Sequence, residues 1–112
     1  MSTKRPELRL KASAPIFAAL GDETRLALIE RLSDGKPCSI AQLTEGSSLT
    51  RQAVTKHLRV LEGVSIVRGV RTGRETLFEL DPTPLRIVRD YADVVSQQWD
   101  QALSRLKAFV ES

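Results

Sequence analysis

The chain contains 112 residues, the length of one domain and too few for a cofactor domain together with a substrate domain. Hydrophobic residues at 41% and charged residues at 28% are ordinary values for a globular protein. The longest charge-free stretch, Ala12 to Gly21, is shorter than the ~20 residues of a membrane-spanning helix, and the amino terminus lacks the apolar run of a secretory signal. We therefore exclude a multidomain enzyme and a membrane-spanning protein, and expect a protein of the cytoplasm.

The positive charge is concentrated in two segments. Residues 1–11 carry four bases and one acid, and residues 51–74 carry six bases and one acid, although the net charge of the whole chain is only +3. We expect residues 1–12 to form a flexible basic arm and residues 13–112 to form a single domain. Segregated positive charge is typical of proteins that bind nucleic-acid phosphates, and an ordinary solvated surface is the alternative.

The first two helices are predicted from the residues at their ends. Ser13 and Pro15 precede a short apolar segment that Gly21 ends, which predicts a short helix. Asp22 is a typical helix cap. The leucine and isoleucine spacing that follows it predicts a second helix up to the break at Gly35.

The next two helices form a pair. Ser39 and Gln42 make a capping box at the start of a short third helix, which is expected to end near Gly46. Thr50 can cap a fourth helix, in which Gly63 is expected to supply the left-handed residue at the carboxyl-terminal end.

A β-hairpin and a long helix complete the predicted order. Residues 66–70 and 75–80 read as strands, and Gly73 in the polar turn between them is the hairpin signal. Pro84 lies near the first turn of a last helix that can reach Ser112, a length of ~40 Å at ~1.5 Å per residue. The order predicts a mainly α fold with a β-hairpin wing (α+β): a winged helix-turn-helix with a long C-terminal dimerisation helix.

The fourth helix carries the candidate DNA-binding face. At ~100° per residue, Val54, Leu58 and Leu61 form one apolar stripe, and the opposite face holds long or hydroxylated side chains. In a helix-turn-helix motif the second of the two helices enters the major groove, and here that is the fourth helix of the chain. Basic residues of a wing suit contacts with the minor groove or with phosphates. The predicted DNA contacts are Thr50, Arg51, Gln52, Thr55, Lys56, His57, Arg59, Arg71 and Arg74.

Within this set, base reading is assigned to Gln52, Thr55 and Lys56. His57 falls at the border between the apolar stripe and the exposed face, where a structural role or a phosphate contact is favoured over catalysis because the chain has no second histidine. The chain also lacks a glycine-rich phosphate loop and a nucleophile elbow. We expect no enzyme activity.

The last helix carries a predicted dimer interface. Its apolar residues are spaced alternately by four and three, an a/d seam of three heptads with Trp99 as the expected anchor. Packing on its own domain is the alternative for such a stripe. A two-fold dimer would hold two recognition helices ~34–36 Å apart, as half-sites one turn apart require. The predicted interface, including part of the first helix, is Ile16, Phe17, Leu20, Val88, Ala92, Val95, Trp99, Ala102, Leu106 and Phe109.

Several of these segments resemble a known family. The run from Ala53 to Leu61, with the sequence AVTKHLRVL, is similar to the recognition helix of the ArsR family of bacterial winged-helix repressors, and Gly21 to Arg25 resembles the start of that family's second helix. The resemblance implies a homodimer that binds an inverted-repeat operator in double-stranded DNA and leaves it when a signal arrives. A winged-helix protein-interaction module without specific DNA binding is the alternative.

No metal site and no cofactor are expected. The resemblance places the two third-helix cysteines of the metal-sensing members on Ser39 and Ala41, which offer no thiolate, and the last helix has Asp90 and Asp93 but no histidine. Cys38 lies beside a helix amino terminus, where a thiol can be reactive, but it has no resolving partner in its own chain. We expect no response to transition metals, and the effector is unknown.

Overall fold

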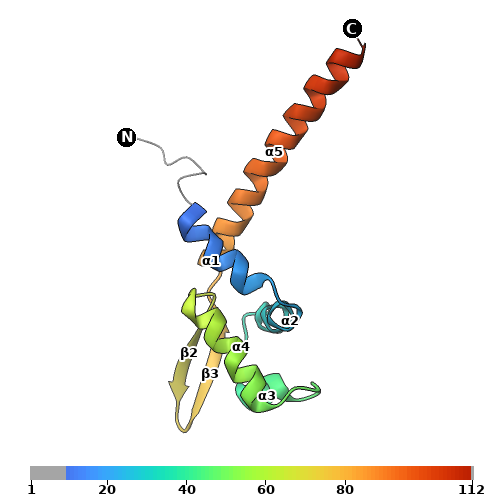
Figure 1. The fold of residues 1–112 in the computed structure, drawn as a ribbon. Coiled ribbons are helices and arrows are strands. Elements are labelled where there is room, and N and C mark those ends of the chain that lie inside the picture. The colour runs from blue at the N-terminus through green and yellow to red at the C-terminus, as the bar shows by residue number, and fades with distance from the viewer. Residues whose placement is uncertain (1–9, 112) are drawn as a thin grey trace, which may run out of the picture.

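The computed structural model describes residues 10–111, so most of the predicted basic arm lies outside the described part of the chain. The predicted mainly α fold with a β-hairpin wing and a long last helix is confirmed (Figure 1). The elements in chain order are α1 Leu10–Leu20, α2 Glu23–Leu32, β1 Cys38–Ser39, α3 Ile40–Thr44, α4 Arg51–Gly63, β2 Val67–Thr72, β3 Glu75–Leu80 and α5 Thr83–Glu111.

The predicted helix caps are confirmed. The Asp22 carboxylate accepts a hydrogen bond from the backbone N–H of Arg25 at 3.0 Å, and the Thr50 hydroxyl accepts one from the backbone N–H of Ala53 at 3.0 Å. The capping box of α3 is complete in both directions, at 3.1 Å and 2.8 Å. Each cap satisfies a backbone donor that the first turn of a helix leaves without a partner.

Helix α1 begins earlier than the sequence predicts. It starts at Leu10, so Ser13 and Pro15 lie inside the helix rather than ahead of it, and residues 10–12 of the expected arm are helical. Proline removes one intrahelical hydrogen bond, a loss that lies close to the amino-terminal end of α1. Ile16 and Ala19 are buried on the side of α1 that faces the core, and this packing holds the helix together.

Helix α4 ends differently from the prediction. The left-handed residue is Ser65, with a φ of 64°, and not Gly63, which is the last residue of the helix. The Ser65 N–H donates to the Glu62 carbonyl and the Ile66 N–H donates to the Leu61 carbonyl, both at 3.0 Å, which is the Schellman pattern. Leu61 and Ile66 are fully buried. Their hydrophobic contact fixes which residue turns left-handed, although the local sequence favours glycine.

A three-stranded antiparallel sheet has the order β1-β3-β2. Strand β2 extends to Thr72, beyond the predicted residue 70, and pairs Thr72 with Glu75. The hairpin loop therefore contains only Gly73 and Arg74, and Gly73 adopts the positive φ (64°) that such tight loops need. The two-residue strand β1 is not predicted by the sequence, because it forms only when Cys38 pairs with Phe78 of β3.

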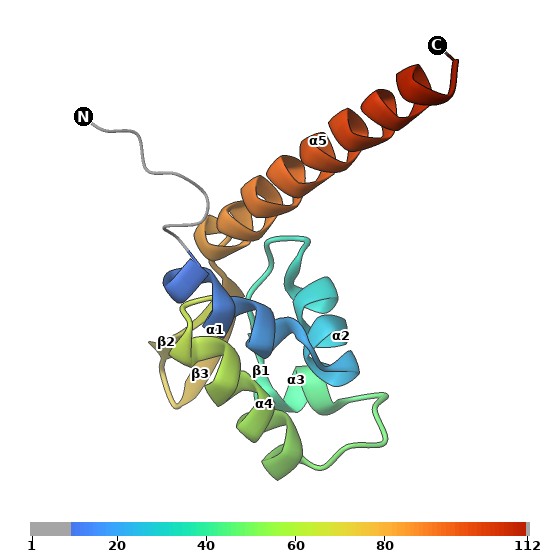
Figure 2. The ribbon, with the colours of Figure 1, turned by 45° about the horizontal axis from the view of Figure 1, so that its top comes forward.

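The hydrophobic core lies between α1, α2, α3, α4 and the sheet. Its fully buried side chains include Leu32, Val54, Leu58, Leu61 and Ile66. Helix α5 packs beside α1 at its start and then projects away from the body of the domain (Figures 1 and 2). No helix within residues 10–111 combines the length and apolar character that crossing a bilayer requires.

Candidate nucleic-acid interface

The two faces of α4 are separated as the helical geometry predicts. Val54, Leu58 and Leu61 have no exposed surface, and α3 packs against the same helix. The opposite face of α4 is therefore turned outward. The amino-terminal end of α4 and the tip of the β2–β3 hairpin lie at the same end of the molecule, opposite the free end of α5 (Figure 1). One surface thus combines the predicted recognition helix and the predicted wing.

Three long side chains near the start of α4 are exposed and available for contacts. Arg51, Gln52 and Lys56 make no side-chain hydrogen bond or ion pair with any other residue of the described chain. Arg74 in the hairpin loop is likewise exposed and unpaired within residues 10–111. A guanidinium or ammonium group without a protein partner can bind phosphate oxygens or base edges without first breaking an ion pair.

Two other arginines of the basic segment are already paired. Arg59 donates to the carboxylate of Glu62 at 3.0 Å on α4, and Arg68 donates to the carboxylate of Glu79 at 2.7 Å across the hairpin. The Arg59 pair has the i,i+3 spacing that the sequence alone could have revealed. The second pair depends on the strand register, which places Arg68 opposite Glu79. The positive charge offered to DNA is therefore smaller than the count of bases suggests.

The two strands of the wing approach each other closely at Gly69. Gly69 lies opposite Phe78 in the register, and a Cβ at this glycine would come within 3.2 Å of the buried Phe78 ring and 2.8 Å of the Thr76 methyl group.

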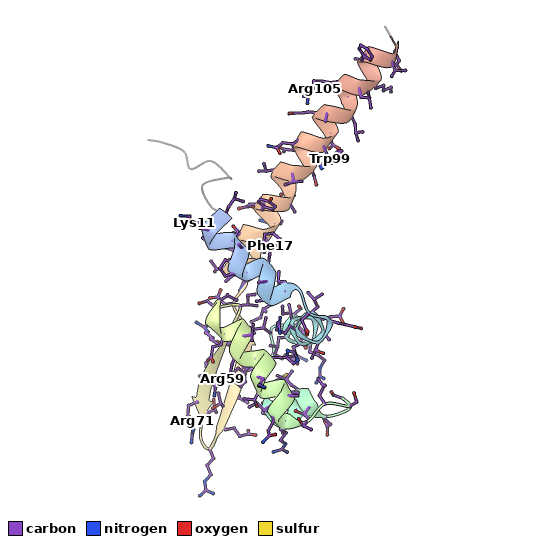
Figure 3. All side chains as sticks on the ribbon, viewed as in Figure 1. Lys11, Phe17, Arg59, Arg71, Trp99 and Arg105 are labelled. Atoms are coloured by element: carbon purple, nitrogen blue, oxygen red, sulfur yellow. The ribbon has the colours of Figure 1, made fainter. Side chains whose placement is uncertain are left out.

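Arg71 donates through Nε to the Gly73 carbonyl at 3.2 Å, which directs its side chain along the loop. Figure 3 shows Arg71 on the wing and Arg59 on α4 toward the same end of the molecule.

Thr55 presents its methyl group rather than a free hydroxyl proton. Its Oγ1 donates to the Arg51 carbonyl at 2.7 Å within α4, whereas the Thr50 hydroxyl accepts from the Ala53 N–H in its cap. The contact that we expect between Thr55 and a base is therefore an apolar one, and a threonine methyl group fits the methyl group of thymine.

This geometry predicts opposite behaviour for two conservative substitutions. Thr55→Val retains the methyl group and should leave operator affinity nearly unchanged, whereas Thr55→Ser loses it. At about 0.8 kcal/mol for each methyl group and two half-sites, the serine variant should bind about tenfold more weakly. Fluorescence anisotropy with an operator duplex measures both affinities. Weaker binding of the valine variant than of the serine variant would contradict the assignment.

His57 is turned toward helix α2. Its Nδ1 lies 3.2 Å from Nη1 of Arg25 and 3.7 Å from Oδ2 of Asp22, and its side chain is 24% exposed. A guanidinium only donates, so this contact is a hydrogen bond when Nδ1 of His57 carries no proton and accepts. The sequence did not identify Arg25 as a partner, because the two residues are far apart in the chain. A phosphate contact by His57 stays a prediction.

Two carboxyl groups that lie just before helices have lowered pKa values: Asp22 before α2 and Asp81 before α5. The hydrogen bond from the Arg25 backbone N–H, aided by the charges of Arg25 and His57, keeps the pKa of Asp22 below its usual value. Hydrogen bonds from Thr83 do the same for the pKa of Asp81, just before α5. A depressed pKa stabilises the folded state above the pKa of the unfolded chain, and this stabilisation is lost as the pH falls through the folded pKa.

We therefore expect Asp22→Asn and Asp81→Asn together to flatten the acid limb of stability. An asparagine still accepts the backbone hydrogen bond at either position but does not titrate, so the variant should lose less stability between neutral pH and pH values below about 4. Urea unfolding across this range measures the free energy of unfolding. An acid limb as steep as that of the wild type would exclude the two carboxyl groups as its source.

The predicted dimer-interface residues divide into two groups. Ile16 is buried in the core of its own domain, which leaves little of its side chain for a partner, so its place in the interface stays a prediction. Leu20 and Val88 also pack against the core, partly exposed. The exposed group lies on α1 and along α5, and contains Phe17, Ala92, Trp99, Leu106 and Phe109, with Val95 and Ala102 half-buried.

The exposed group forms a continuous apolar surface. Phe17 of α1 packs edge to face on Tyr91 of α5, with ring centroids 5.4 Å apart. Farther along α5, Trp99 is 64% exposed and lines a shallow groove of about 190 Å³ together with Val95 and Ala102. Figure 3 shows Trp99 on the part of α5 that projects from the body. The core of its own domain leaves this half of α5 uncovered.

Cys38 is part of a strand and not of a helix. It lies in β1, where it pairs with Phe78 of β3, and it is half-buried. Its sulfur lies 3.7 Å from the Lys36 carbonyl oxygen. Ser39 caps α3 after it. The described residues contain no group of three or more His, Cys, Asp or Glu side chains arranged to hold a metal ion.

Comparison with known proteins identifies the family. Residues 20–70 match a family described as a helix-turn-helix domain. The chain is 34% identical over 96 residues to the HTH-type transcriptional regulator Rv2034 of Mycobacterium tuberculosis, covering 86% of each chain. It also resembles the solved structure of an ArsR-like transcriptional regulator from Rhodococcus sp. RHA1, with a TM-score of 0.81 and 30% identity over 92% of this chain and 94% of that one. The chain belongs to the ArsR family.

The resemblance of this ArsR-family chain to a more distant structure concerns the fold alone. The fragment of Mb0332 from Mycobacterium bovis, described as a homodimeric winged helix-turn-helix DNA-binding domain, has 17% identity and a TM-score of 0.63, over 93% of each chain. The predicted winged-helix fold is thereby confirmed. The ArsR family consists of transcriptional regulators, so this chain is a regulator of transcription and not an enzyme.

Proposed function

We propose that this ArsR-family chain is a homodimeric repressor that acts in the cytoplasm and binds an inverted-repeat operator in double-stranded DNA. Helix α4 enters the major groove, where Gln52, Thr55 and Lys56 read base edges, and Arg51 contacts a base or a flanking phosphate. Arg71 and Arg74 of the wing contact phosphates or the adjacent minor groove. Bound over a promoter, the dimer blocks access of RNA polymerase.

One observation carries this proposal. The exposed side chains Arg51, Gln52 and Lys56 have no partner in the described chain and lie on α4, at the same end of the molecule as the unpaired Arg74. On a surface that served only solubility, the bases would gain from nearby acids, as Arg59 and Arg68 do. A set of unpaired cations around a helix of this shape is suited to a duplex.

The apolar surface of α5 supports the dimer. Exposed apolar patches of this kind mark interaction sites, and a second copy of α5 offers a matching seam under two-fold symmetry. The homodimeric Mb0332 domain has the same fold. Two-fold pairing would hold two α4 helices at the ~34–36 Å separation of half-sites one turn apart.

Selection of bound sequences from random duplexes by the purified protein tests the proposal. We expect an inverted repeat and steep salt dependence: if two cations of each protomer reach phosphates, the slope of log affinity against log salt is about −3.6 or steeper. The selected sequence, placed over a promoter, should lower transcription in vitro when the protein is added. No enriched repeat together with a flat salt response would favour the protein-interaction module instead.

A further inference from the structure

Arg25 of α2 connects three helices through one side chain. Its Nε donates to the Ala19 carbonyl at 2.6 Å, and its Nη2 donates to the Ala18 carbonyl at 3.5 Å, both in the last turn of α1. Its Nη1 lies 3.2 Å from Nδ1 of His57 on α4. The same residue thus contacts the helix that begins the predicted dimer surface and the helix that carries the predicted base-reading face.

The chemistry of the guanidinium suits this position. The last carbonyls of a helix lack the usual partner four residues later, and an arginine offers five donors in a rigid plane, so one side chain can bind the end of α1 and His57 at the same time. The Ala18 carbonyl also accepts the Gly21 backbone N–H at 3.2 Å. Asp22 completes the cluster: it accepts the Arg25 backbone N–H at 3.0 Å and lies 3.7 Å from Nδ1 of His57. A lysine, with a single point of attachment, could not replace all of these contacts.

The cluster connects the helix proposed to read bases, α4, with the helix that begins the proposed dimer surface, α1. His57 is one position after Lys56 and two after Thr55, so the orientation of its ring is tied to the turn of α4 that is assigned to base reading. Phe17, on the turn of α1 just before Ala18, packs on α5. A small rotation of α4 relative to α1 would change the angle and the separation of both recognition helices in a dimer, without altering the α5 surface.

We propose that Arg25 is a positioning residue for operator binding: it fixes the orientation of α4 relative to α1 by holding the last carbonyls of α1 and Nδ1 of His57 together. This inference rests on the proposed function. According to this inference, two features set the half-site spacing that the dimer accepts: the Arg25–His57 contact and the dimer interface. The competing explanation is that Arg25 only stabilises the end of α1, in which case its loss lowers stability alone.

The experiment uses the full chain and the duplex selected by the wild-type protein. Operator affinity is measured by anisotropy well below the unfolding temperature, with sedimentation to verify the dimer and circular dichroism to verify the fold. Arg31→Ala is the matched control, because Arg31 is also an arginine of α2 that donates to a backbone carbonyl, that of Gln42 on α3, at 3.1 Å, but makes no hydrogen bond to α4 within residues 10–111.

We expect Arg25→Ala to bind the operator at least tenfold more weakly as a folded dimer, and Arg31→Ala to change affinity less than threefold. His57→Leu should match Arg25→Ala, and the double variant should be no weaker than either single variant, because both remove one contact. His57→Asn, whose Oδ1 can accept in place of Nδ1, should restore most of the affinity. On duplexes with the spacer changed by one base pair, Arg25→Ala should discriminate less than the wild type.

Several outcomes would overturn the proposal. They are additive losses in the double variant, unchanged spacer preference, or a loss of affinity equal to that of the Arg31→Ala control. If Arg25→Ala does not fold, Arg25→Lys takes its place and the same spacer comparison decides. A wild-type protein that selects no duplex contradicts the proposed function itself, whereas normal binding and spacer preference of Arg25→Ala contradict this inference alone.

Discussion

Replacing Gln52 and Lys56 together by alanine is expected to reduce operator affinity about 100-fold or more, to nearly the affinity for random duplex. Each good base contact contributes about 1–3 kcal/mol, and a symmetric dimer makes each contact twice, so even the lower end of this range, about 4 kcal/mol in all, exceeds a 100-fold loss. Both side chains are exposed and unpaired within the described chain, and the fold should not change.

The measurement is the ratio of affinities for the selected operator and for a random duplex of the same length at a fixed salt concentration. Arg59→Ala is the matched control on the same helix, since Arg59 is already paired with Glu62 and its removal should cost far less. Arg74→Ala should differ in kind: it should weaken all duplexes alike and reduce the salt slope. A Gln52/Lys56 variant with the selectivity of the wild type would remove α4 from base reading.

Exchanging Trp99 for aspartate is expected to dissociate the dimer. The indole is 64% exposed in the single chain, and an interface tryptophan of this kind is a typical hot spot, with losses of about 2 kcal/mol or more on truncation. A carboxylate in its place adds the cost of burying a charge between two apolar helices. We expect the dimer to dissociate at least about 30-fold more readily. Operator affinity should fall further, since a monomer holds only one half-site.

Sedimentation at micromolar concentration measures the assembly. Gln97→Asp introduces the same charge two residues away, on the opposite side of α5, and should leave both the dimer and operator affinity intact. A wild-type protein of monomeric mass, or a Trp99→Asp variant with an unchanged dimer, would show that α5 does not mediate pairing. Equal effects of both substitutions would indicate damage to the helix and not to an interface.

The sequence predicts those parts of the molecule that depend on neighbours in the chain. The caps of Asp22, Ser39 and Thr50 act over three residues, and the stripe of Val54, Leu58 and Leu61 follows from the helical repeat, so each could be read directly. The same applies to the hairpin signal and to the exposed face of α4. These features were sufficient to predict the winged helix-turn-helix and to select the candidate DNA-contacting face.

The tertiary structure decides wherever a residue responds to a partner far away in the chain. Ser65 rather than Gly63 is left-handed because Ile66 must reach Leu61 in the core. Ile16 packs into the core of its own domain, because the core covers that side of α1.

Charge follows the same division. The number of bases is a property of the sequence, but their availability is not: the strand register pairs Arg68 with Glu79, and the packing of α2 against α4 brings Arg25 to His57. Neither pairing could be predicted from periodicity or from a short-range motif, because each joins two residues that only folding brings together. The residues of the basic face were therefore determined by the sequence, whereas which of them remain free for DNA was decided by the packing of the elements that carry them.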